Sequence, residues 1–235
     1  MLILGIETST AQISVAIGGH EGVIASAQAR RGQRHAETLV PMVSYICQVA
    51  HVSLSEIGAV AVGVGPGLYT GLRVGISAAK AMALGLRTPM IGVPSLDLLA
   101  FPVRFTNRLI VTLMDARRGE VFHAAYRSTP GGIQRLGPHE VASPEDVASD
   151  LQAANRDCLI VGDGGLRYAD LLAPLRGIEL AEAGLAYPSA SALVQLAHAQ
   201  ALREEFVAPD EVRPVYLRRP DAEANWIERP VAERG

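Results

Sequence analysis

A histidine stands where a helical metal site would begin. Two histidines four residues apart on a helix would face one metal ion, and His35 is the first position of such a pattern. The second position is Leu39, and Glu37 lies only two residues from His35, so its side chain would point across the helix. The spacing therefore argues against a metal site, and we expect no metal-ligating set here.

Acidic and hydroxyl side chains follow two segments that have the composition of buried strands. Glu7, Thr8 and Ser9 end the first apolar run of the chain, and Asp163 follows residues 159–161. A pair of acids across a cleft would suit Mg²⁺ and phosphate oxygens. Asp and Ser also cap turns without any ligand, so the residues leave both interpretations open.

A glycine-rich stretch separates a strand-like segment from a helix-like one. Backbone amides at such a junction can bind an anion. A P-loop needs a lysine that is missing here, and a dinucleotide fingerprint needs glycine where Leu68 stands. Tight turning and close packing are the favoured interpretation, with anion binding as the alternative. No Ser-His-Asp set, Cys-His pair or Cys-x-x-Cys stands out, so the sequence names no catalytic residue and no cofactor site.

The elements that would position these residues alternate between strands and helices in the first half. Hydrophobic periodicity predicts antiparallel strands over 2–9, 13–17 and 23–29, helices over 36–50 and 71–86, and strands over 57–64 and 90–93. Ser95 is expected to cap a short helix over 96–100.

The second half begins where composition changes at residues 101–107, which divides the chain into lobes 1–104 and 105–235. We predict a hairpin from 109–115 and 121–126, a helix capped by Ser143, a strand running into a glycine turn at 162–165, a helix over 189–205, an extended piece over 214–218 and a loose tail from 220. The 189–205 helix could pack either within the second lobe or back on the first lobe. Such alternation fits sheets covered by helices.

Composition restricts the function classes. The 235 residues are 49% hydrophobic and carry a net charge of −3, which argues against a protein that clamps nucleic acid by itself. A tight basic group, Arg30, Arg31 and Arg34, is interpreted as a solvated loop. Cys47 and Cys158 lie in apolar runs and should be reduced and buried. With no signal-like N-terminus and no long apolar run, we expect a cytoplasmic protein without a membrane span.

Two predicted helices carry unusual faces. Leu39, Met42, Val43 and Ile46 form an apolar stripe in the first helix, and small residues recur every four positions from Gly71 in the second. A helix that is apolar or small nearly all round is buried, either in its own core or by a partner. The pattern leaves both alternatives open.

Several motifs in one order match a known family. They are Ile6-Glu7-Thr8-Ser9, residues 35–41 (HAETLVP), 65–73 (GPGLYTGLR), 115–122 (DARRGEVF), 162–164 (GDG) and 214–218 (PVYLR). On these the chain resembles the bacterial tRNA threonylcarbamoyladenosine biosynthesis proteins of the TsaB (YeaZ) type. Two departures are Glu7, where the family usually has aspartate, and Leu68-Tyr69, where Ser-Phe is common.

The resemblance implies an α/β, two-lobed actin-like ATPase fold, each lobe a mixed sheet flanked by helices. It also implies a non-catalytic subunit that pairs with a TsaD-type catalytic subunit and a TsaE-type ATPase, meets tRNA through the complex, and forms a homodimer when alone. TsaD carries a paired-histidine metal motif, and Leu39 stands where its second histidine belongs. The subunit would hold no cofactor on its own, although a nucleotide at the complex interface is compatible with the family.

The resemblance also gives the two helices a use as the partner-binding surface. The residues expected at this interface are Leu39, Met42, Val43, Ile46, Leu72, Gly75, Ile76 and Ala79. The alternative function is a nucleotide-hydrolysing enzyme of the same fold, using Glu7, Thr8, Asp163 and the glycine loops.

Overall fold

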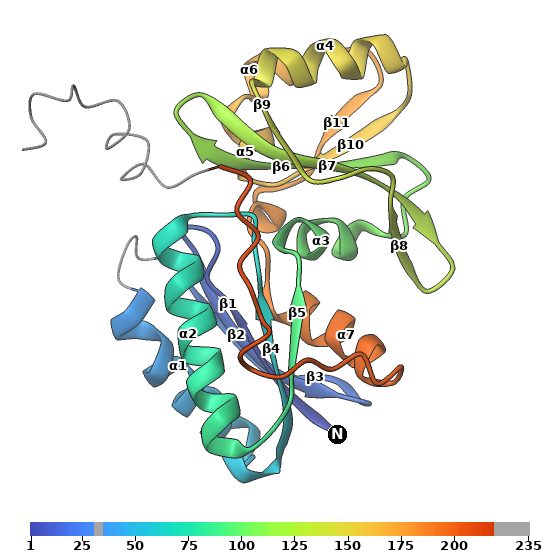
Figure 1. The fold of residues 1–235 in the computed structure, drawn as a ribbon. Coiled ribbons are helices and arrows are strands. Elements are labelled where there is room, and N and C mark those ends of the chain that lie inside the picture. The colour runs from blue at the N-terminus through green and yellow to red at the C-terminus, as the bar shows by residue number, and fades with distance from the viewer. Residues whose placement is uncertain (31–34, 219–235) are drawn as a thin grey trace, which may run out of the picture.

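The first lobe is built on a five-stranded mixed sheet (Figure 1). The structure, a computed structural model, describes residues 1–30 and 35–218. Strands β1, β2 and β3 run antiparallel, and β4 and β5 continue parallel to β1, giving the order β3-β2-β1-β4-β5. Their bounds are β1 Leu2–Glu7, β2 Ile13–Gly19, β3 Gly22–Ala29, β4 Ile57–Gly63 and β5 Met90–Val93.

The second lobe repeats this plan. Its sheet has the order β11-β10-β6-β7-β8, with β6, β7 and β8 antiparallel, β10 and β11 parallel to β6, and β9 paired with β7. The bounds are β6 Leu109–Arg117, β7 Glu120–Thr129, β8 Gly132–Arg135, β9 Glu140–Ala142, β10 Cys158–Val161 and β11 Ile178–Leu180. Two lobes with one strand order and mixed sheets confirm the predicted fold class.

Helices cover both faces of the first sheet. The helices α1 (His35–Ala50) and α2 (Tyr69–Leu86) lie side by side on one face, and α7 (Ala190–Ala201) lies on the other (Figure 1). Alternate residues of the central strands therefore enter different cores: Leu4 packs toward α1 and α2, whereas Ile3 packs toward α7. Burial on both faces explains why these strands are almost continuously apolar.

The C-terminal part of the chain returns to the first lobe. The bridge between Met90 and Val207 and the bond from the Val215 N–H to the Val64 carbonyl (2.7 Å) fix this path beside β4 and β5. The extended piece predicted over 214–218 thus supplies a backbone bond to the first sheet.

The second lobe carries the shorter helices. These are α4 (Pro144–Ala154), α5 (Asp163–Arg167) and α6 (Ala169–Leu172), while α3 (Ser95–Ala100) and short 3₁₀ turns at Leu54–Glu56, Phe101–Val103 and Ala183–Leu185 complete the described chain. Ser143 caps α4 as predicted, because its hydroxyl accepts the Asp146 N–H at 3.1 Å.

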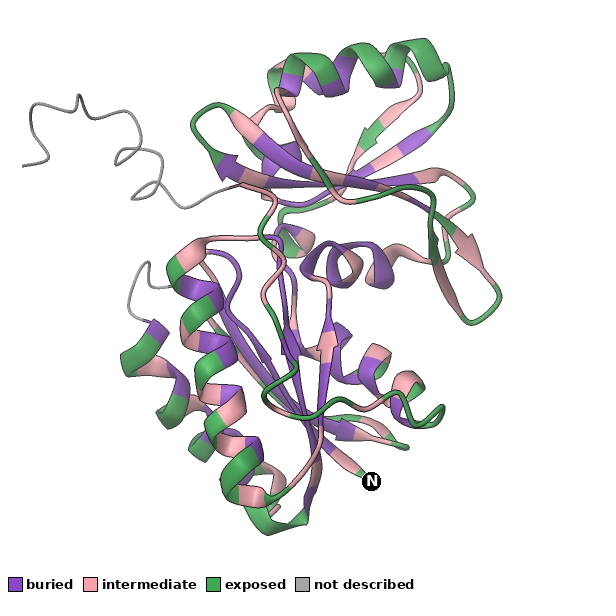
Figure 2. Cartoon of the chain, in the orientation of Figure 1, coloured by how far each residue is buried: buried purple, intermediate pink, exposed green. Residues whose placement is uncertain are grey.

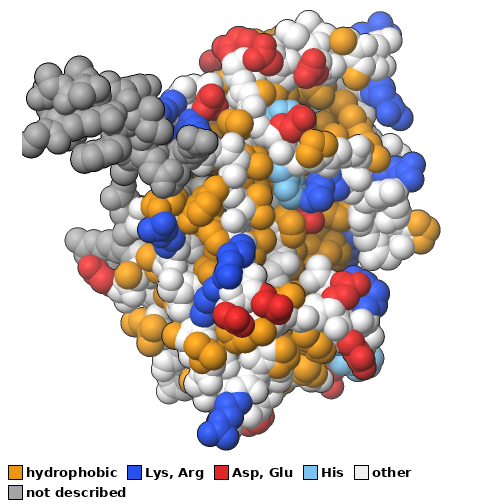
Figure 3. Space-filling view, viewed as in Figure 1, with side chains coloured by type: hydrophobic (Ala, Val, Ile, Leu, Met, Phe, Trp, Pro, Cys, Tyr) orange, Lys and Arg blue, Asp and Glu red, His pale blue; other side chains and the backbone are white. Residues whose placement is uncertain are grey.

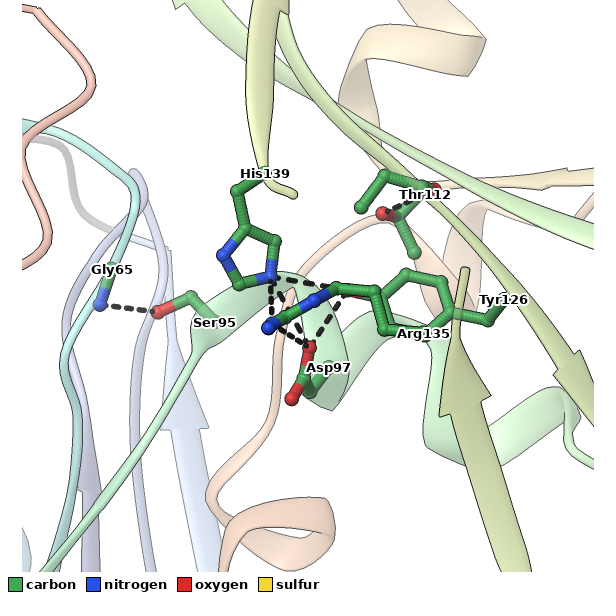
Figure 4. A network of polar contacts seen from close by, with 8 residues as sticks. Gly65, Ser95, Asp97, Thr112, Tyr126, Arg135 and His139 are labelled. Carbon is green, nitrogen blue, oxygen red and sulfur yellow. Dashed lines mark hydrogen bonds and ion pairs between the residues drawn. The ribbon is translucent and has the colours of Figure 1, made fainter. Parts of the chain in front are cut away.

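A polar cluster joins α3 to the second sheet (Figure 4). The Asp97 carboxylate accepts the Tyr126 hydroxyl at 2.8 Å and lies 3.3 Å from His139 Nε2 and 3.6 Å from Arg135 Nη1. Burial, followed by the charge of Asp97, raises the pKa of the Tyr126 phenol well above its usual value. Tyr126 therefore stays neutral and donates, tying β7 to the helix that leaves the first lobe.

Three local predictions were wrong. Ser95 is the first residue of α3 and Pro94 is its cap, because the Ser95 hydroxyl is engaged with Glu7 and Gly65 instead. The predicted glycine turn after β10 is the first turn of α5, which Asp163 begins. The helix predicted over 189–205 ends at Ala201.

Other expectations concern burial and composition. Cys47 and Cys158 are free and buried, as predicted. Within residues 1–30 and 35–218, no helix has the length and apolar character needed to cross a membrane. Arg31, Arg34 and the predicted loose tail from residue 220 lie outside the described residues.

Candidate functional site

The end of β1 is sealed inside the first lobe. Glu7 is fully buried, and its carboxylate accepts the Ser9 N–H at 2.5 Å and the Ser95 O–H at 3.1 Å. Burial raises the pKa of Glu7 above the usual 4.5, and the hydrogen bonds from Ser9, Ser95 and Thr8 oppose that rise. A Cβ at Gly63 would lie 1.8 Å from Glu7 Oε2, so the carboxylate fills the space beside β4 rather than facing the gap between the lobes.

The glycine loop uses its backbone groups within the chain. Gly65 exchanges two hydrogen bonds with Ser95: its N–H donates to Ser95 Oγ at 3.2 Å, and its carbonyl accepts the Ser95 N–H at 2.8 Å (Figure 4). The Leu68 N–H donates to the Ser9 carbonyl at 2.7 Å. At these two residues the amides are therefore already satisfied, which supports the packing interpretation over anion binding.

Glycines also let α2 approach the end of β1 directly. The Thr8 hydroxyl donates to the Gly71 carbonyl at 2.8 Å. A Cβ would lie 2.4 Å from the Ser9 carbonyl oxygen at Gly67, 2.2 Å from the Thr8 carbonyl oxygen at Gly71 and 2.0 Å from Thr8 Oγ1 at Gly75. Real Cβ atoms do not come this close. The glycines of the motif are therefore needed for α2 to pack directly against the end of β1.

His35 has a backbone partner. Its Nε2 lies 2.8 Å from the Thr10 carbonyl oxygen, and because a carbonyl only accepts, Nε2 carries the proton. Leu39, one turn later, is buried in the core of the first lobe. Among the described residues, no three His, Cys, Asp or Glu side chains gather in a group that could hold a metal ion.

The gap between the lobes contains a hollow of about 350 Å³. Asp115 in this hollow is paired with Arg117 at 3.4 Å and Arg167 at 3.3 Å, and its N–H donates to Asp163 Oδ1 at 3.0 Å. Burial is the main cause that raises the pKa of Asp163. The full lining is Ala11, Arg30, Asp115, Arg117, Asp163, Leu166, Arg167, Ala183, Ala186 and Tyr187.

Of the two interpretations left open for the acids, a pair across a cleft is not formed in the described structure. Both acids of the hollow come from the second lobe, and Glu7 does not line it. Arg30, Arg167 and Tyr187 line the same hollow as Asp163, which their positions in the sequence do not reveal. The Arg30 guanidinium lies 5.1 Å from the centre of the Tyr187 ring. These residues come from distant segments, so only the folded chain brings them together.

The structure places most of the residues predicted at the partner interface in the core of the first lobe. Seven of the eight are buried in the first lobe itself because α1 and α2 turn this stripe onto the sheet, and Met42 is half-buried against the same core. The seven are Leu39, Val43, Ile46, Leu72, Gly75, Ile76 and Ala79.

The outer sides of α1 and α2 carry a different apolar set. Val40, Tyr45 and Val49 on α1 and Leu84 on α2 are each 55–66% exposed. Figure 2 shows the alternation of buried and exposed residues along both helices, and Figure 3 shows hydrophobic side chains at the surface of this lobe. We call these four residues the outer helix surface. These are large apolar side chains of the two helices that a partner could reach.

Two lobes that repeat one sheet plan define a protein of the actin-like ATPase fold. In this chain Glu7, the acid at the end of β1, is buried and does not line the gap between the lobes. The ethanolamine utilization protein EutJ from Carboxydothermus hydrogenoformans shares this fold, with a TM-score of 0.50 at 12% identity over 84% of this chain and 89% of that one. Residues 20–226 match the family described as TsaD, tRNA N6-adenosine threonylcarbamoyltransferase.

Relatives within that family identify the group to which this chain belongs. The tRNA threonylcarbamoyladenosine biosynthesis protein TsaB of Escherichia coli is 34% identical over 93% of this chain and 95% of its own length. TsaB of Bacillus subtilis is 29% identical over 97% and 99%. The solved structure of YeaZ from Pseudomonas aeruginosa superposes with a TM-score of 0.81 at 32% identity, over 92% of this chain and 99% of that one. The chain belongs to the TsaB (YeaZ) group of the TsaD family.

Proposed function

We propose that this chain is a non-catalytic subunit of a bacterial complex that forms threonylcarbamoyladenosine in tRNA. The named TsaB relatives are biosynthesis proteins of this modified nucleoside. The observation that carries the proposal is that the described chain lacks a histidine pair for a metal. The His35 Nε2–H donates to the Thr10 carbonyl, and the position of a second ligand is taken by Leu39, which is buried in the core. Transfer then takes place on a TsaD-type partner, which this chain supports by binding.

The outer helix surface supports the binding part of the proposal. Val40, Tyr45, Val49 and Leu84 expose apolar area on two adjacent helices, and apolar centres with aromatic anchors dominate the affinity of interfaces. In the absence of the partner, the same surface would pair with a second copy. A two-fold contact of this kind requires only that the patch be self-complementary.

The other components of the proposed complex follow from the resemblance to the family. A TsaE-type ATPase joins the complex, tRNA meets this chain through the assembly, and any nucleotide lies at an interface rather than within this chain. The complex works in the cytoplasm.

The alternative function, nucleotide hydrolysis by the chain itself, is disfavoured by two sets of contacts, one around Glu7 and one around Asp115. Glu7 is buried against Gly63 and Ser95, and Asp115 is already paired with two arginines. An incoming Mg²⁺–nucleotide would have to displace both sets. Calorimetric titration of the chain with ATP and Mg²⁺ tests this, and micromolar binding would favour the alternative.

The pairing experiment uses purified chain and the TsaD-type protein of the same organism, followed by sedimentation velocity. Tyr45→Asp with Val49→Asp should weaken pairing by roughly tenfold or more, because charge would be placed at the apolar centre. Leu202→Asp is the matched control, since Leu202 is 73% exposed beyond α7 on the other side of the sheet. Equal pairing by wild type and the α1 double variant would refute the assigned surface.

A further inference from the structure

A second hollow lies in the second lobe, where the chain enters β6 and leaves β7. Its volume is about 330 Å³. Three of its eight lining residues are arginines and none is acidic, although the whole chain has a net charge of −3. The lining is Thr106, Asn107, Arg108, Leu109, Arg127, Ser128, Leu136 and Arg156. We call this the basic hollow.

The arginines of the basic hollow are unequally compensated. Arg108 is held by Glu179 at 3.1 Å and by the Gly177 carbonyl at 3.2 Å. Arg127 donates through Nε to the neutral side chain of Gln134 at 2.8 Å. Neither Arg127 nor Arg156 forms an ion pair with any residue in the described part of the chain. Two guanidinium charges therefore remain available to an anion from outside.

An exposed aromatic ring lies next to a residue of the lining. Phe105 is 82% exposed and directly precedes Thr106, the first residue of the lining. The Arg104 guanidinium lies 4.3 Å from the centre of the Phe105 ring and 3.9 Å from the centre of the Phe101 ring. An exposed phenyl ring beside cationic side chains suits an unpaired nucleobase, which stacks on the ring while its phosphates meet arginine.

We propose that the basic hollow binds the phosphate backbone of RNA, with an unpaired base stacked on Phe105. RNA accounts for both features, because a free phosphate would use the arginines and leave the ring without a role. The proposal rests on the proposed function for the source of the RNA, which is the tRNA substrate of the complex. A local patch of this size adds to RNA binding by an assembly and does not require a basic chain.

The basic hollow is separate from the outer helix surface. Figure 1 places α1 on the left of the first lobe and β8 on the right of the second, and Figure 3 shows Lys and Arg side chains spaced along that right-hand edge. RNA and a protein partner could therefore bind at the same time, and variants at one site should leave the other intact.

The experiment measures fluorescence anisotropy of a labelled, unmodified tRNA transcript with the full chain, alone and mixed with its TsaD-type partner. Arg127→Glu and Arg156→Glu should each weaken binding by roughly tenfold and reduce the salt dependence by about one phosphate contact. Phe105→Ala should weaken binding by roughly tenfold with little change in that salt dependence. Arg203→Glu, an exposed arginine beyond α7 with the same change of charge, should bind like wild type.

Several outcomes would overturn the proposal. One is unchanged tRNA binding by the Arg127, Arg156 and Phe105 variants in both samples. A separate titration with inorganic phosphate gives another: the hollow would bind phosphate, yet the affinity for tRNA would be the same in all three variants as in wild type. Sedimentation of the same variants with the partner separates the two claims: intact pairing with indifferent RNA binding refutes only this inference, whereas absence of wild-type pairing refutes the proposed function.

Discussion

Gly75 of α2 and Thr8 at the end of β1 are in direct contact: a Cβ on Gly75 would lie 2.0 Å from Thr8 Oγ1. A larger side chain fits there only if the Thr8 side chain rotates, which breaks its bond to Gly71, or if the helix moves away from the strand. The hydrogen bond from Thr8 to the Gly71 carbonyl, one turn earlier, depends on the same close approach.

Gly75→Ala should therefore lower the free energy of unfolding by about 2 kcal/mol through overpacking. Gly85→Ala is the matched control. Gly85 lies in the same helix, and a Cβ there would meet no neighbouring atom within 4 Å. Alanine there should raise stability by about 0.5–1 kcal/mol. Urea denaturation measures both variants, and equal effects would contradict the assigned contact.

Ile46 and Tyr45 are neighbours in α1 that differ in burial, because Ile46 faces the core and Tyr45 faces outward. Ile46 is 1% exposed and Tyr45 is 59% exposed. Ile46→Asp should destabilise the fold by about 4 kcal/mol or more, because it places an unpaired charge in the core, whereas Tyr45→Asp should leave stability within about 0.5 kcal/mol. Thermal unfolding followed by circular dichroism decides between them; a folded, fully stable Ile46→Asp chain would show that this side of α1 is not core.

The burial of Glu7 predicts a pH dependence of stability. Because its folded pKa lies above the usual 4.5, the folded chain retains a proton that the unfolded chain has lost. The free energy of unfolding should thus fall as pH rises from about 4.5 through the folded pKa. Asp163, whose pKa is also raised, contributes with the same sign.

Glu7→Gln should remove the Glu7 part of this dependence and equal or exceed wild-type stability at neutral pH. Denaturant titrations across pH 4–8 measure the effect, with Asp163→Asn compared alongside. A Glu7→Gln chain that keeps the full wild-type pH slope would contradict a buried, proton-retaining Glu7.

The Tyr126 hydroxyl stabilises the junction between the lobes through Asp97 (Figure 4). Tyr126→Phe should cost about 1.5 kcal/mol, since a carboxylate loses a hydrogen-bond donor in a partly buried place. Tyr45→Phe, an exposed control, should cost nothing measurable. The free energies of unfolding from urea titrations provide the test, and equal stability of both variants would mean that the bond contributes nothing.

Much of the first lobe is predictable from sequence because its strands and helices are long and strongly periodic. The strands from Leu2 to Ala29 and the helices near 36–50 and 71–86 come within a few residues of their structural bounds. The short strands β8, β9 and β11 leave too few residues for a period to emerge.

The burial of the predicted interface residues could not be foreseen from the sequence. A stripe such as Leu39, Val43 and Ile46 is apolar whether it faces its own sheet or another protein, so periodicity cannot distinguish the two. The exposed residue Tyr45 carried no periodic signal. The role of Ser95 was equally hidden, because its partner Glu7 is 88 positions away.

The central claim, that this chain assists catalysis without performing it, is tested most directly by a modification assay. The purified chain, its TsaD-type partner and their mixture are each given threonylcarbamoyl-adenylate and unmodified tRNA, and threonylcarbamoyladenosine is quantified by mass spectrometry of the digested tRNA. We expect no product from this chain alone and markedly more from the mixture than from the partner. Sustained turnover by the chain alone would contradict the claim.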